Sequence, residues 1–224
     1  MRRMAGGTMK EEFLKAWKTA KESSPKRKFT QSGELIIALK DLDIKKQDNQ
    51  IDVFVQLPHA TGKKIKICAL VGPELQAQAK ECCDTVILTE EFSKYKDKKV
   101  LKKLAEDHHH FIAQANIMAD VAKTFGKVFG PKGKMPNPKA GCVVPPNANL
   151  KQVTDRLRKL TRIVTRNQLN TKCMVGKEDQ DDAQVIENSI AVYNQVLSNL
   201  PGEKANIKSV ILKTTMGKPA KVKV

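Results

Sequence analysis

The segment that most constrains the fold of this chain lies between residues 63 and 129, where short apolar runs alternate with amphipathic ones. The runs at 65–71, 85–88 and 111–113 are almost continuously apolar, which is typical of strands that are buried on both faces of a parallel sheet. A segment with helical spacing of apolar residues follows each run. This alternation predicts a three-layer, Rossmann-like α/β domain, in which helices cover both faces of a parallel sheet.

The chain on either side of this segment has a different pattern. Phe13, Trp17 and Ala20 have helical spacing, and alternating apolar residues predict strands at 35–39 and 52–57. Because only a polar connection separates these two strands, we expect them to pair antiparallel with each other. Towards the C-terminus we expect helices at 149–160 and 181–200, a β-rich segment at 161–166 and a final strand at 207–212.

Strands and helices at both chain ends, with an α/β unit between them, predict a discontinuous α+β first domain into which a second domain is inserted. We place the first domain at residues 1–61 and 157–224, and the inserted α/β domain at residues 62–156. The sequence alone also allows two consecutive domains.

The residues at 130–141, Gly-Pro-Lys-Gly-Lys-Met-Pro-Asn-Pro-Lys-Ala-Gly, contain three glycines and three prolines and cannot continue a helix or fill a central strand. An amphipathic helix precedes them and the apolar run at 142–146 follows them, so both ends are tethered to packed structure. We therefore expect an ordered, irregular loop that carries Lys132, Lys134 and Lys139. These lysines are candidates for secondary RNA contacts or for contacts between the domains.

The charge of the chain indicates the class of its partner. Its 224 residues include 41 Lys and Arg against 24 Asp and Glu, a net charge of +17 that a polyanion would balance. Nucleic acid is favoured over a membrane surface, because the lysines are spread through segments that should fold and no basic amphipathic helix stands out. No apolar run is long enough to span a bilayer and residues 1–7 lack the apolar core of a signal peptide, so we expect the protein to stay where it is made. Five cysteines at irregular spacing are typical of reduced thiols in the cytoplasm.

Metal and enzyme chemistry are poorly supported. Three adjacent histidines at 108–110 would point to alternate faces of a strand, and Cys82-Cys83 is not a spaced ligand pair, so we expect no metal and no cofactor. Gly72-Pro73-Glu74 after the first strand of the central unit is not a phosphate-binding motif. A nucleotide-binding enzyme that uses the central α/β unit is kept as an alternative, and so is a nucleic-acid chaperone that binds by charge alone.

Two short segments are candidate RNA contacts. Lys26, Arg27, Lys28 and Phe29 combine three cations, which can neutralise phosphates, with an aromatic ring that can stack on a base. The segment 213–217 combines hydroxyls and exposed backbone N–H groups with a glycine that permits close approach. The alternative is that Phe29 and Met216 only fill the core. The full candidate set is Lys26, Arg27, Lys28, Phe29, Arg166, Lys172, Lys213, Thr214, Thr215, Met216 and Gly217.

Three separated stretches resemble one known family. Residues 130–138 match its G-P-x-G-x-M-P-x-P motif, residues 26–29 match its Lys-Phe entrance to a strand, and residues 213–219 match its T-M-G motif. The family is the universal large-subunit ribosomal protein L-one family, and the forms of the second and third motifs are closest to archaeal and eukaryotic members. The M-P-N-P form of the first favours the archaeal members.

The resemblance implies a structural protein that binds rRNA at the mobile stalk of the large subunit, in the cytoplasm, and is a monomer when free. It implies two domains joined by a hinge, which we place near Thr61-Gly62 and Leu160-Thr161. Phe29 and the T-M-G segment would face the RNA, and Lys172 takes the place in an RNA-facing loop where bacterial members often carry His. Further implied partners are exit-site tRNA, which the stalk releases, and the protein's own mRNA, which it would repress.

Overall fold

A computed structural model describes residues 6–43, 50–95, 97–165 and 168–223. The chain divides into two compact units, of which the first joins both chain ends, Met1–Lys63 with Lys159–Val224, and the second is Lys64–Arg158.

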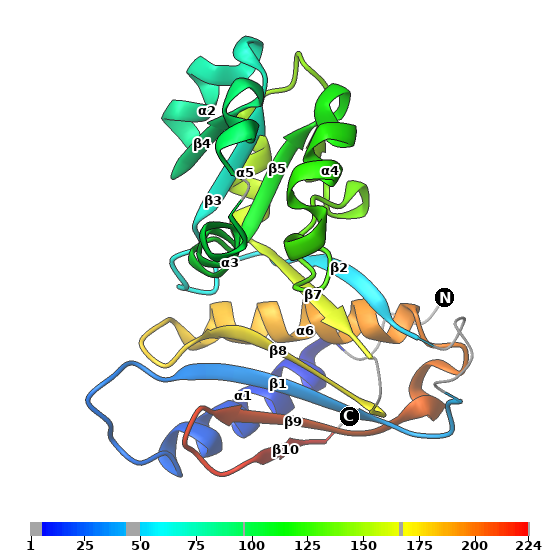
Figure 1. The fold of residues 1–224 in the computed structure, drawn as a ribbon. Helices are drawn as coiled ribbons and strands as arrows, with labels where there is room; N and C mark the ends of the chain where they lie inside the picture. The colour runs from blue at the N-terminus through cyan, green and yellow to red at the C-terminus, as the bar shows by residue number, and fades with distance from the viewer. Residues whose placement is uncertain (1–5, 44–49, 96, 166–167, 224) are drawn as a thin grey trace. The chain divides into compact units, whose positions relative to one another are not determined.

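The first unit is built on a four-stranded antiparallel sheet in the order β10-β9-β1-β8 (Figure 1). The strands are β1 (Ser32–Leu39), β8 (Asn170–Lys177), β9 (Ile207–Thr214) and β10 (Ala220–Val222). β1 is flanked by β8 and β9, so the N-terminal strand of the chain is held between two strands from its C-terminal third.

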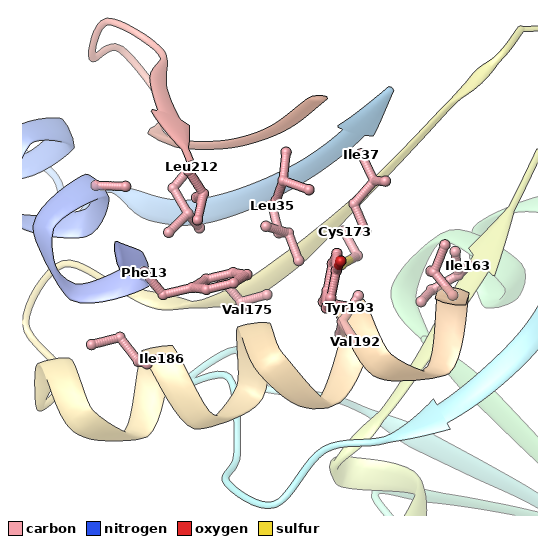
Figure 2. Close-up of a cluster of buried hydrophobic side chains, with 14 of the residues drawn as sticks. Phe13, Leu35, Ile37, Ile163, Cys173, Val175, Ile186, Val192, Tyr193 and Leu212 are labelled. Atoms are coloured by element: carbon pink, nitrogen blue, oxygen red, sulfur yellow. The ribbon is translucent and has the colours of Figure 1, made fainter. Parts of the chain in front are cut away.

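Two long helices, α1 (Gly6–Glu22) and α6 (Asp182–Ser198), pack on one face of this sheet. Residues of β1 alternate between buried and half-buried positions, because successive side chains of a strand point to opposite faces. Figure 2 shows the buried side chains of β1, β8 and β9 directed towards those of the two helices. Phe13 of α1 meets Tyr193 of α6 edge-on, with ring centroids 6.1 Å apart. One apolar core therefore joins both ends of the chain.

A separate two-stranded ribbon belongs to the same unit. β2 (Asp52–Gln56) pairs antiparallel with β7 (Leu160–Val164), and Val55 and Ile163 enter the core described above. The expected pairing of 35–39 with 52–57 is wrong, because the two edges of β1 are occupied by β8 and β9. Leu160 and Thr161, near which we place one strand of the hinge, are paired with β2 in this ribbon.

The second unit is an α/β structure with a parallel four-stranded sheet in the order β4-β3-β5-β6. Its strands are β3 (Ile67–Val71), β4 (Thr85–Leu88), β5 (His110–Gln114) and β6 (Val143–Val144). The helices are α2 (Gln76–Cys82), α3 (Lys98–Asp107), α4 (Met118–Phe129) and α5 (Leu150–Arg158). The mixed α/β class and the parallel sheet are thus confirmed.

Helices cover this sheet on both faces, as the apolar runs predicted. α3 packs beside α4, and their buried side chains share an aromatic cluster with β3 and β5. α2 packs beside α5 and contacts β3 and β4. Every residue of β3 is buried, which explains why its sequence is apolar throughout instead of alternating.

The glycine- and proline-rich loop after α4 is ordered by its own polar groups. Asn137 accepts a hydrogen bond from the Lys139 N–H at 2.9 Å, which starts a short 3-10 turn at Pro138–Ala140. Gly141 follows in a left-handed conformation with φ 72°. Lys132 donates to Glu106 at 2.7 Å and Lys134 donates to the backbone carbonyls of His108 and His109. Lys132 and Lys134, two of the three lysines that we expected on this loop, therefore hold the loop against the end of α3.

The remaining expectations have mixed outcomes. The segment at 171–176, which we expected to be a loop, lies inside strand β8. All five cysteines are free in the structure, and Cys68, Cys142 and Cys173 are buried. Of the helices in the described ranges, none combines the length and the apolarity that crossing a membrane requires.

Candidate nucleic-acid interface

Two of the sequence motifs meet at one end of the antiparallel sheet. The segment at 24–31 leads into β1, and the segment at 215–219 joins β9 to β10. Because Gly33 is paired with Thr214 across the two antiparallel strands, the chain before Gly33 and the chain after Thr214 leave the sheet at the same end. We call these two segments the sheet-end loops.

Hydrogen bonds fasten the sheet-end loops to each other. The buried side chain of Gln31 donates to Ser24 Oγ at 2.7 Å and to the Pro25 carbonyl at 3.0 Å, while its Oε1 accepts from the Met216 N–H at 3.0 Å. Thr215 Oγ1 accepts from the Ser32 N–H at 3.1 Å. The buried side-chain amide of Gln31 thus holds two turns in place, the one that precedes Phe29 and the one that carries Met216.

Phe29 and Met216 are exposed at this end of the sheet. Their exposed fractions are 54% and 51%, the highest of the four exposed large apolar side chains in the described residues. The alternative in which both fill the core is therefore excluded. An exposed ring and an exposed thioether on hydrogen-bonded loops are suited to stacking and packing against bases and riboses.

The cations next to Phe29 are exposed as well. Lys26, Arg27 and Lys28 all lie on the surface within the first sheet-end loop. Cations in this arrangement give an RNA-binding surface its salt-dependent affinity, while the apolar pair adds contacts that salt does not screen.

Lys213 and Lys172 lie on the sheet instead of in its end loops. Both have buried neighbours on either side in the strand, so they point to the face opposite the helices. Lys213 is paired with Glu34. Lys172 is paired with Ile36, about 13 Å along the strand from the sheet end at about 3.3 Å per residue. Lys172 is thus separated from the sheet-end loops, and Arg166 lies outside the described residues.

One expected contact residue is corrected. The Thr214 side chain is fully buried, and its hydroxyl donates to Ser24 Oγ at 2.8 Å, so this hydroxyl holds the loop and does not reach the surface. A Cβ at Gly217 would collide with Thr214 Oγ1 and would lie 3.3 Å from the Ala20 carbonyl oxygen. Gly217 is therefore required because the loop closes tightly over Thr214.

Gln31 and Ser24 were missed by sequence reasoning. Ser24 stands in a Ser-Ser-Pro stretch that is sufficiently explained by the end of α1, and a single glutamine before a strand carries no periodic signal. Only the pairing of β1 with β9 brings these side chains to the second loop.

The central unit does not provide a free nucleotide site where such folds usually have one. In open α/β sheets, ligands bind beyond the carboxyl ends of the strands where the strand order reverses, which here lies between β3 and β5. Gln114, at the end of β5, accepts from the Gly72 N–H at 2.9 Å and donates to Glu74 at 3.0 Å. Its buried amide occupies the backbone donor that a phosphate would need.

The histidine run does not form a metal centre. His108 is buried, with Nε2 2.8 Å from Thr85 Oγ1 and Nδ1 3.0 Å from the Leu104 carbonyl, so both ring nitrogens are engaged. In the part of the chain that the structure describes, no group of three or more His, Cys, Asp or Glu side chains is gathered for a metal ion.

Comparison with known proteins identifies the family of this chain. The model of the ribosomal protein L1p/L10e family matches residues 17–218. A large ribosomal subunit protein uL1 from Nanoarchaeum equitans is 41% identical over 209 residues, 92% of this chain and 96% of the relative. The uL1 protein of Methanothermococcus thermolithotrophicus is 42% identical over 214 residues, 95% of this chain and 98% of the relative. That of Methanocaldococcus jannaschii is 40% identical over 215 residues, 96% of each chain.

The match extends from the middle of α1 into the second sheet-end loop, so it includes all the described candidate contact residues. With about 40% identity to several archaeal relatives over nearly its whole length, this chain belongs to the ribosomal protein L1p/L10e family.

Proposed function

We propose that this chain is a structural protein of the large ribosomal subunit, whose first unit binds a folded rRNA element at the mobile stalk. Its relatives are named as large ribosomal subunit proteins, and that name describes a structural role, not an enzymatic one. A protein with this role works in the cytoplasm, where it is associated with ribosomes.

The exposure of Phe29 and Met216 on loops joined through Gln31 is the observation that carries the proposal. Large apolar side chains in water stabilise nothing in the free protein, whereas each stacked base contributes about 1–3 kcal/mol to RNA binding. Lys26, Arg27 and Lys28 would neutralise phosphates beside them. The contacts that such a surface offers favour shape and 2′-OH recognition over base reading.

The two compact units would act as two domains, with the discontinuous unit as the primary RNA-binding one. From the family resemblance we further propose two roles, the movement of deacylated tRNA out of the exit site and repression of the protein's own mRNA through a copy of the rRNA site. Free in solution, the protein would be a monomer.

A titration at several salt concentrations tests the proposal. The full chain is mixed with a folded rRNA stalk fragment and, separately, with a duplex of random sequence. We expect a preference for the stalk of about 10³-fold or more that persists at every salt concentration. If both affinities fall together and converge as salt is raised, binding is by charge alone and the chaperone alternative is correct.

A further inference from the structure

The second unit has a groove that the proposed function does not use. It is about 340 Å³ in volume and lies between the 3-10 segment η3 (Thr89–Lys94), α3 and α4. Its sides carry Lys98 from the start of α3 and Lys123 and Lys127 from α4. We call it the α3–α4 groove.

All the charged side chains that line the groove are positive. All three lysines are exposed, and none of the side chains that line the groove is acidic. Lys123 has an acidic neighbour in its own helix, Asp120, at 3.6 Å, but both side chains are more than half exposed, and such surface pairs contribute little. The groove is therefore suited to an anionic ligand.

The spacing of the cations fits a chain of anions better than a single one. Lys123 and Lys127 are one helical turn apart, which places their Cβ atoms about 5–6 Å from each other on the same face of α4. This is comparable to the separation of successive phosphates along a nucleic-acid strand. Lys98 lines the groove from the other helix, so a strand in the groove would have cations on both sides.

The floor of the groove distinguishes a nucleic acid from an acidic peptide. Phe92, Leu101 and Val128 form it, and their exposed fractions are only 6%, 3% and 7%. An amphipathic acidic helix needs open apolar pockets for its anchor residues, and this sealed floor does not offer them. The phosphate–ribose backbone of a nucleic acid binds without such apolar pockets.

Hydroxyls and one aromatic ring complete the lining. Thr124 carries a hydroxyl that can donate to phosphate or ribose oxygens, while the Ser93 hydroxyl donates to the Glu90 carbonyl at 3.4 Å and can accept from a ribose hydroxyl. Tyr95 is partly exposed, and its ring is supported by Phe125, with centroids 5.9 Å apart. A supported, half-exposed ring beside cations is the arrangement that single-strand binding proteins use to stack a base.

We propose that the α3–α4 groove is a second RNA-binding site, which takes a single-stranded segment of RNA and is independent of the sheet-end loops. The inference relies on the proposed function only for the class of ligand. Lys98, Lys123 and Lys127 contact the phosphates, and Tyr95 stacks on one base.

The test uses the full chain saturated with unlabelled rRNA stalk fragment, to which a labelled single-stranded RNA of about 10 nucleotides is added. The groove variant carries Lys98→Gln, Lys123→Gln and Lys127→Gln. The matched control carries Lys80→Gln, Lys103→Gln and Lys151→Gln, three exposed lysines of the same unit that do not line the groove. Fluorescence anisotropy gives the affinity for the single strand at several salt concentrations.

We expect the groove variant to lose at least tenfold in single-strand affinity and its salt slope to fall by about 2, while the control changes by about twofold or less. Tyr95→Leu should lose fivefold or more, and Tyr95→Phe should retain affinity. Equal losses in the two triple variants, absence of saturable binding, or preferential capture of poly-glutamate would each overturn the proposal.

Stalk affinity, measured in the same variants, separates this inference from the proposed function. If the groove variant binds the stalk normally and loses only the single strand, both proposals stand. A wild-type chain that binds the single strand but shows no preference for the stalk would overturn the proposed function and leave the groove proposal intact.

Discussion

The side-chain oxygen of Gln31 accepts a hydrogen bond from the backbone N–H of Met216 at 3.0 Å, across 185 residues of sequence. The amide nitrogen of the same side chain donates to Ser24 Oγ and to the Pro25 carbonyl. Gln31 thus joins the loop that carries Phe29 to the loop that carries Met216, and the proposed RNA-binding surface depends on both loops being held together.

Gln31→Ala is expected to destabilise the first unit and weaken stalk binding. The substitution leaves the Met216 N–H and the groups at Ser24 and Pro25 without their partner, and such a loss costs about 1–3 kcal/mol. Gln31→Glu keeps the acceptor for Met216 but places a buried carboxylate against the Pro25 carbonyl oxygen, so it should also destabilise the unit. Denaturation followed by the fluorescence of Trp17, the only tryptophan, measures stability, and a stalk titration measures affinity.

Phe29→Ala and Met216→Ala should each weaken the stalk complex by about 1–3 kcal/mol and leave its salt slope unchanged, because an apolar contact releases no counterions. Neither should lower the stability of the free protein, since both side chains are exposed.

Leu169→Ala is the control for these two variants. Leu169 is also an exposed apolar residue of the first unit, but its carbonyl accepts from the N–H of Leu39 at 2.7 Å, so it lies at the opposite end of β1. Its replacement should not change the affinity. An equal loss in all three variants would show that the sheet end has no special role.

Asp182 makes the first unit sensitive to acid. Burial alone would raise the pKa of this carboxyl, but hydrogen bonds from Lys21 at 2.7 Å and from the Trp17 indole N–H at 2.8 Å hold its pKa below the usual value. Because the pKa is lower in the folded state than in the unfolded one, the stabilisation is complete above about pH 4 and is lost as the pH falls further.

Asp182→Ala should therefore cost about 1–3 kcal/mol at neutral pH, because the buried indole N–H of Trp17 loses its acceptor. Asp182→Asn keeps an acceptor and should cost less. In both variants the acid-induced loss of stability below about pH 4 should be smaller than in the wild type. Urea denaturation at a series of pH values, followed through Trp17, measures this, and an unchanged pH profile would contradict the assignment.

The cysteines should differ in their reaction with alkylating reagents. Burial raises the pKa of the thiols of Cys68 and Cys142, and it raises that of Cys173 to about 12. Burial, with the neighbouring Cys82 and Asp84, raises the pKa of Cys83 to about 11. Since the thiolate is the reactive form and the reagent must reach it, we expect the buried Cys68, Cys142 and Cys173 to be labelled only on unfolding, and the half-buried Cys83 to be labelled slowly in the native protein near pH 8. Mass spectrometry of a time course identifies the order.

The sequence predicted the second unit well because its signals are local. Strand β3 and helix α4 were each recognisable from their own apolar pattern, and the crossover from one parallel strand to the next follows chain order. The first unit was predicted less well, since β1 pairs with strands that are distant in sequence. Strand β8 follows the period-two pattern of a strand over residues 170–175. Thr171, Cys173 and Val175 are buried there, and the residues between them are more exposed.

The arrangement of the sheet-end loops could be predicted only in part for the same reason. The exposed residues Phe29 and Met216 stand in short motifs that carry chemistry and can be recognised without a fold. The buried residues that position them cannot, because the hydrogen bonds of Gln31 and of Thr214 exist only after β1 and β9 have paired. This is why Thr214 was expected at the surface, although its side chain is buried and its hydroxyl donates a hydrogen bond to Ser24.

Photo-crosslinking tests the sheet-end loops most directly. The same photoreactive amino acid is installed in turn at Phe29, Met216 and Leu169, and each protein is irradiated in complex with the rRNA stalk fragment. We predict crosslinks from positions 29 and 216 to neighbouring nucleotides of the fragment, and none from position 169 at the other end of β1. Crosslinks from position 169, or none from positions 29 and 216 in a complex of full affinity, would contradict the assignment of the RNA-binding surface.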